Sequence, residues 1–258
     1  PALGWMFVAS LRAQFRMSRR DIGDLFMAIS HPVYALIFMA IFVHVGREDL
    51  ASYALVAPML MGVVGTAAFV AGELVMRERR DQTLEVSVIC PVPFPAVIFS
   101  RILVITAISM VGIVESWLIV RFGFGIDIAI HHPGTFAAAI LLTTIASAGT
   151  ALIAAAVFCF AEEVRTFQNS ITFPLLLFSG VLVPVTAFPD WLEPISRAVF
   201  LYWSADLLRA SMQPEIPQGA DLALAALAGL GIGSTLLGAV LLRRMIGYLR
   251  REGRLGVF

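Results

Sequence analysis

The stretch GTFAAAILLTTIASAGTALIAAAVFCFA, residues 134–161, contains no charged residue. A helix needs about 20 consecutive apolar residues to cross the hydrocarbon core of a bilayer. This run is longer than that. It is also continuously apolar, whereas a strand of a membrane barrel alternates apolar and polar residues. The stretch therefore predicts a transmembrane helix.

The rest of the chain has the same character. Hydrophobic residues make up 59% of the 258 positions and charged residues only 14%, against roughly a quarter charged in soluble domains. Six apolar runs have the length of a span, at residues 24 or 31 to 45, 52–76, 95–120, 134–161, 167–185 and 222–242. We predict an all-α polytopic membrane protein, with six transmembrane helices in a single domain over residues 1–258.

The arginines indicate the orientation of this domain. All 18 basic residues are Arg, and most of them fall within residues 12–20, 77–80 and 243–254. Basic residues accumulate on the cytoplasmic side of membrane proteins, so we expect both termini to be cytoplasmic. The net charge is zero, and no nucleic-acid partner is expected.

Residues 1–23 form the first segment outside the spans. Trp5, Phe7, Leu11 and Phe15 recur every two to four positions among arginines, which is typical of an amphipathic helix on the membrane surface. The alternative is a solvated leader. The first span is not expected to be a cleaved signal peptide, because no small-residue cleavage site follows it.

Residues 77–94 connect the second and third spans. Their charged half is followed by a short apolar stretch and then by Pro91, Pro93 and Pro95, which stop a helix. This pattern predicts a short cytoplasmic helix to which a soluble partner docks; the alternative is a solvated loop. The candidate docking residues are Glu78, Arg79, Arg80, Asp81, Gln82, Thr83, Leu84 and Glu85.

A second informative stretch precedes the last span. Gly180 and Pro184 are expected to weaken the outer end of the fifth helix. Phe188, Pro189 and Trp191 follow them, in a segment too apolar for a free loop and too broken for a span. We predict re-entrant outer helices over residues 186–210, with an amphipathic surface loop as the alternative.

At these two places the sequence resembles the type-2 permeases of ATP-binding-cassette (ABC) transporters. The link carries Glu78-Arg79-Arg80-Asp81-Gln82-Thr83-Leu84-Glu85, similar to the family pattern E-R-x-x-G-T-L-E with Gln82 in place of Gly. The outer segment carries Ser179-Gly180, Pro184, Pro189 and Trp191-Leu192, similar to S-G-x-x-x-P followed by P-x-W-L. Asp206-Leu207-Leu208-Arg209 resembles a later D-x-x-R element.

The resemblance implies the membrane subunit of an exporter in a bacterial inner membrane. It implies a second permease copy, most simply a homodimer, and a pair of ABC ATPase subunits that bind ATP and Mg. It also implies an outer gate at the re-entrant segment, with Gly180, Pro184, Phe188, Pro189 and Trp191 as the gate residues. The chain has no Lys and hence no phosphate-binding loop of its own, so it is not expected to be an ATPase. Few charges lie in the spans, which favours an amphipathic or lipid-linked cargo, either a glycan or a drug-like molecule, in contact with membrane lipid.

Polar residues inside the spans are candidates for a translocation path. Glu115 lies deep in the third span, where it either lines the path or pairs with Arg121. Asn169 and Ser170, near the start of the fifth span, are expected to hydrogen-bond between helices.

Neither a metal site nor a nucleotide site is expected. His131 and His132 are adjacent and point in different directions, and Asp127 adds no third ligand at a fixed spacing. Gly229, Gly231 and Gly233 resemble part of a dinucleotide loop, but no strand precedes them. Together with Gly238 and residues 146–149 they predict close helix packing.

Two other functions stay open at this point. An intramembrane lipid-modifying enzyme would use Glu115 or the paired histidines, and a channel or scaffold subunit would need neither ATP nor a catalytic group.

Overall fold

The computed structural model describes residue 12 and residues 22–47, 50–80, 93–158, 164–183, 185, 188–215 and 219–251. Within these ranges it describes no side chain of residues 22–30, 68–80, 164–169, 171 and 249–250. Most of the predicted surface helix (1–23) and of the predicted docking helix (residues 81–92) lies outside the described residues, as does Pro184.

The described part of the chain is helical and contains no strand. The elements are α2 (Ile22–Val45), α3 (Ala51–Arg80), α5 (Phe94–Ser109), α6 (Gly112–Leu118), η2 (Ile119–Gly123), α7 (Pro133–Phe158), α8 (Val164–Phe178), η4 (Asp190–Leu192), α9 (Glu193–Arg197), α10 (Phe200–Ala210) and α11 (Ala220–Arg251). The prediction of an all-α polytopic membrane protein is thereby confirmed.

Three of the described helical segments are long and apolar enough to cross a membrane: Phe94–Gly123, Pro133–Phe158 and Ala220–Tyr248. Two shorter apolar helices, His31–Val45 and Ala51–Ala67, accompany them. The predicted runs start within about three residues of the helix starts, but α8 ends seven residues before Val185 and α11 continues nine residues beyond Leu242. The number of six spans stays a prediction.

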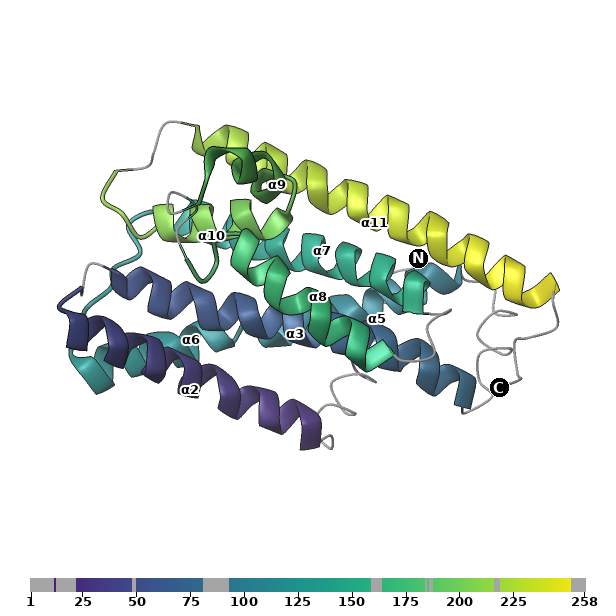
Figure 1. Ribbon diagram of the computed structural model, residues 1–258, viewed down its shortest axis with the longest axis horizontal. Coiled ribbons are helices and arrows are strands. Elements are labelled where there is room, and N and C mark those ends of the chain that lie inside the picture. The colour runs from purple at the N-terminus through teal and green to yellow at the C-terminus, as the bar shows by residue number, and fades with distance from the viewer. Residues whose placement is uncertain are drawn as a thin grey trace.

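The long helices form one elongated bundle. Helices α2 and α11 lie on opposite sides of it, with α3 and α7 between them (Figure 1). The short helices α9 and α10 gather at the end where α2 finishes and α3 begins, and α3 and α11 finish at the other end (Figure 1). The last turn of α3, which leads into the charged link, and the short helices α9 and α10 thus lie toward opposite ends of the bundle (Figure 1).

Small residues set the closest helix contact, between α7 and α11. A Cβ atom added at Gly149 would lie 2.7 Å from the backbone nitrogen of Thr235, and one at Gly238 would lie 2.9 Å from that of Ile153. Lipid offers little hydrophobic drive for association, so such close approach matters in membranes. Packing is confirmed for Gly231 and Gly238, but nothing lies within 4 Å of a Cβ at Gly229 or Gly233.

The third predicted span is interrupted, which the sequence did not indicate. Helix α5 ends at Ser109, α6 begins at Gly112, and the π-helical turn η2 follows. At the break the Met110 nitrogen donates to both the Thr106 and Ala107 carbonyls at 3.3 Å, and Val111 donates to Ile108. Bonds to the residue three positions back, as in a 3₁₀ turn, therefore occur here beside the regular bond from Met110 to Thr106.

Candidate functional site

The C-terminal end of α8 is closed by a glycine turn. The Gly180 nitrogen donates to the Leu177 carbonyl at 3.2 Å, and the φ of Gly180 is +73°. Residues with a side chain rarely adopt this conformation, which commonly ends helices. A Cβ at Gly180 would also lie 2.5 Å from Cγ2 of Val185. The helix therefore ends at Phe178, earlier than the predicted Val185.

Arg209 on α10 holds this turn in place. Its two terminal nitrogens donate to the Gly180 carbonyl oxygen at 3.2 and 3.1 Å. Its guanidinium carbon also lies 4.1 Å from the centre of the Tyr53 ring, near the start of α3. One side chain thus joins α10 to the end of α8 and to α3. We call these contacts of Arg209 with Gly180 and Tyr53 the Arg209 clamp.

The clamp is mostly removed from water. Burial lowers the pKa of Arg209 from its ordinary value, while Tyr53 and Asp206 act in the opposite direction. An arginine remains protonated in any case, so the charge stays and its bonds to Gly180 and the Tyr53 ring are strengthened by the low local dielectric.

A second contact ties α9 to the same turn. The Ser196 hydroxyl is buried and donates to the Phe178 carbonyl at 2.5 Å, with the Leu192 carbonyl at 3.3 Å. Phe178 is the last residue of α8, where a carbonyl lacks a helical partner. Two carbonyl oxygens therefore hold the segment with α9 and α10 in place. Phe178, at the end of α8, accepts from Ser196, and Gly180, in the following turn, accepts from Arg209.

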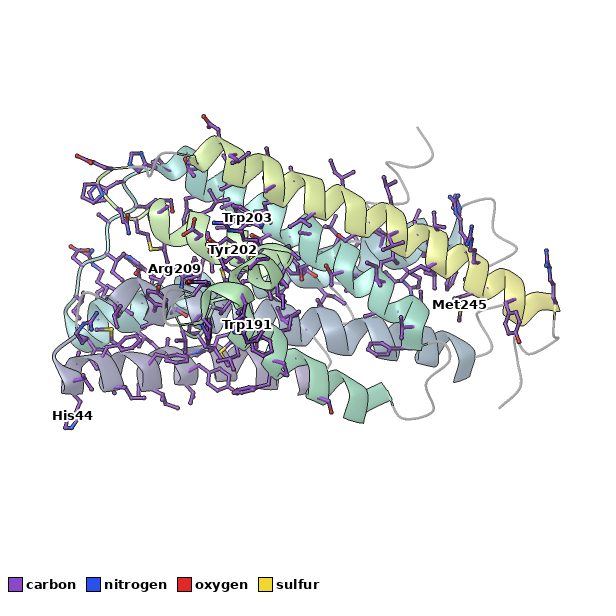
Figure 2. The ribbon with its side chains drawn as sticks, turned by 45° about the horizontal axis from the view of Figure 1, so that its top comes forward. His44, Trp191, Tyr202, Trp203, Arg209 and Met245 are labelled. Carbon is purple, nitrogen blue, oxygen red and sulfur yellow. The ribbon has the colours of Figure 1, made fainter. Side chains whose placement is uncertain are left out.

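The predicted gate residues lie around this turn. Gly180 is buried in it, Phe188 is half-buried, Pro189 is exposed, and Trp191 is 69% exposed. Figure 2 shows Trp191, Tyr202, Trp203 and Arg209 in one region, where the short helices meet the bundle. Exposed aromatic rings of this kind are typical of membrane–water interfaces. The short helices predicted before the last span are present as η4, α9 and α10, whereas their re-entry into the membrane stays a prediction.

Glu115 takes a partner that the sequence did not indicate. Its Oε2 atom lies 3.7 Å from Nδ1 of His31, on α2. Arg121, the pairing partner considered for Glu115, forms an ion pair with Asp127 and stacks on Trp117 at 5.3 Å. The Glu115–Arg121 alternative is therefore wrong.

The other predicted polar residues are dispersed. Ser170 is exposed on α8, and the Asn169 side chain lies outside those described. His131 is exposed, while His132 lies 3.1 Å from the Pro214 carbonyl oxygen. Across the described residues, no three His, Cys, Asp or Glu side chains gather as metal ligands.

Residues 6–212 match the protein-family profile described as ABC-2 type transporter. This is most of the chain, from before α2 to just beyond α10.

The chain belongs to the ABC-2 type transporter family.

As an ABC-2 protein, the chain is a membrane permease component of an ABC transporter, and members of this family normally work with an ABC ATPase subunit. No match was found among curated proteins. The matched residues include both the charged link and the Arg209 clamp.

Only some of the ATPase-docking residues predicted for this ABC-2 permease lie within the described part of the chain. Glu78, Arg79 and Arg80 form the last turn of α3, at the end of the bundle away from α9 and α10 (Figure 1). Asp81 to Glu85 lie outside the described residues, so their docking role stays a prediction.

The sequence did not predict a role for three residues that make contacts in the structure. His31 is an ionisable residue within an apolar run, and that signal alone marks a candidate functional residue in a membrane. Tyr53 and Ser196 gave no signal of their own, because each acts through a contact with a distant segment.

Proposed function

We propose that this chain is the permease subunit of an ATP-driven exporter in a bacterial inner membrane, with both termini in the cytoplasm. Two copies would pair with two ATPase subunits, which bind ATP and Mg. The arginine distribution supports this orientation, and the family supports the ATPase partner.

The observation that supports this proposal best is the course of α3. This helix runs over 30 residues, from Ala51 to Arg80, a length of about 45 Å at 1.5 Å per residue. Its first turns contact the Arg209 clamp through Tyr53, and its last turn leads into the charged link. One helix thus connects the proposed ATPase-docking segment with the proposed outer gate.

A mechanism follows from this connection. Closure of the ATPase pair on ATP would push the link and tilt α3 as a rigid element. The tilt would displace Tyr53 relative to Arg209 and loosen the turn at Gly180. Cargo would then leave between the two permeases, on the side of α9 and α10.

The cargo we propose is amphipathic or lipid-linked, either a glycan or a drug-like molecule. Of the few charged side chains in the three described spans, Arg101 and Glu115 lie furthest from the span ends, and so few charges do not suit a highly charged solute. Exposed apolar side chains on α2, including Leu36, Ile37 and Ile41, offer a surface for lipid or for the second copy.

The experiment is to express the chain with its cognate ATPase and to purify the assembly in lipid. We expect the two proteins to co-purify and ATP hydrolysis to respond to cargo. A permease that binds no ATPase but modifies a lipid would favour the enzyme alternative, and ATP-independent conductance would favour a channel.

A further inference from the structure

His31 and Glu115 meet inside the helical bundle, from α2 and α6. His31 is 4% exposed, and its Nδ1 atom lies 3.7 Å from Glu115 Oε2. Neither Nε2 of His31 nor Oε2 of Glu115 has a hydrogen-bond partner, although both atoms are buried. Buried polar atoms without partners are rare and costly, and in a native protein they call for a functional reason.

Glycines make the space that His31 occupies. A Cβ at Gly62 on α3 would lie 1.5 Å from Nε2 of His31, and a Cβ at Gly112 would lie 3.0 Å from Nδ1. No side chain larger than hydrogen fits at Gly62 while the ring stays there. Gly112 is also the first residue after the break in the third span, so the ring sits beside an irregular backbone.

Few other charges reach this position. Within the described part of α3, Tyr53 is the titratable side chain, and it faces Arg209. In η2, after α6, Arg121 forms an ion pair with Asp127. His44 lies exposed at the far end of α2. Among described side chains, Glu115 is therefore the titratable group that faces His31.

From this juxtaposition we propose that His31 and Glu115 form a proton-binding site that holds α2 against α6 while it carries one proton. With one proton the pair is electrically neutral, whether the proton resides on the imidazole beside a carboxylate or on the carboxyl beside a neutral ring. Loss of that proton leaves a lone carboxylate, which a membrane interior strongly disfavours. Deprotonation therefore loosens α2 from α6.

The consequence is a link between proton binding and the position of the first helix. Any conformation that separates α2 from α6 gives water access to the pair and releases its proton. The site binds the proton again when the helices close. This proposal is independent of the cargo and of the direction of transport.

The test uses the full chain, purified without any ATPase in nanodiscs, so that its outcome is separate from that of the proposed function. The thermal unfolding midpoint is measured between pH 5.5 and 9 for the wild type, Glu115→Gln and His44→Gln. We expect the wild-type midpoint to fall as the pH rises above neutral, since the folded state then binds more protons than the unfolded state. Glu115→Gln removes the carboxylate that pairs with His31 and should flatten this fall, whereas His44→Gln should keep it.

Infrared difference spectroscopy gives a second measurement. If His31 and Glu115 only packed the helices together, their infrared signals would not change with pH. A carboxyl signal that titrates in the wild type and is absent in Glu115→Gln, or an imidazolium signal absent in His31→Gln, supports the site. The proposal is overturned by a wild-type midpoint that does not fall with rising pH, by the same fall in Glu115→Gln, or by the absence of both infrared signals.

Discussion

Both terminal nitrogens of Arg209 donate to the carbonyl oxygen of Gly180, at 3.2 and 3.1 Å. The acceptor belongs to the turn that ends α8, and the donor belongs to α10. The same guanidinium lies over Tyr53 of α3. A single side chain therefore bridges α10, the turn after α8 and the start of α3.

Replacing Arg209 with lysine should loosen this junction. A lysine keeps the charge, but it has no planar group to donate twice to one carbonyl and stack on Tyr53. We expect a loss of about 1–3 kcal/mol in unfolding free energy and slower export. Arg197→Lys is the matched control, since Arg197 is exposed and pairs with Glu193 within one helix. Equal effects of the two changes in thermal denaturation would contradict the clamp.

Gly180→Ala should destabilise the turn through both its backbone and its contacts. The left-handed conformation costs an alanine about 1–2 kcal/mol, and the new Cβ would lie 2.5 Å from Val185. Gly46→Ala is a control for the backbone effect, because Gly46 has a φ of +72° and nothing within 4 Å of a Cβ. In thermal unfolding, Gly180→Ala should lower the midpoint further than Gly46→Ala; an equal shift would show that the contact with Val185 is unimportant.

Gly62→Ala should displace His31 from its place between α3 and α6. The added methyl group would overlap the imidazole ring, and overpacking of this kind costs about 1–3 kcal/mol. Gly229→Ala introduces the same methyl group in a helix where nothing lies within 4 Å, and should be neutral or slightly stabilising. If both variants unfold at the wild-type temperature, the ring does not occupy this position.

Much of the fold follows from features that are local in the sequence. Continuous apolar runs predicted where the long helices begin within about three residues, since a span depends on length and composition alone, but they placed the ends of α8 and α11 seven and nine residues away. Gly180 was expected to weaken the end of α8, and the structure shows that it closes the helix there. The short helices after it were likewise visible in alternating turn-forming and aromatic residues.

The contacts between distant segments were not predictable in this way. Nothing near Glu115 indicates that its partner is His31, because the approach depends on the absence of side chains at Gly62 and Gly112. Arg209 stood out as part of a motif, but its acceptor became evident only from the three-dimensional structure.

In the proposed mechanism, ATP hydrolysis by a partner subunit acts on this permease through the charged link after α3. The most direct measurement compares ATP-driven accumulation of an amphipathic or lipid-linked probe in inverted vesicles that contain the cognate ATPase with wild-type permease, Glu78→Arg or Glu85→Arg. We predict accumulation with the wild type, and continued ATP hydrolysis without accumulation in both variants, which should remain folded. No accumulation with the wild type for any probe, or undiminished accumulation in both variants, would contradict the account.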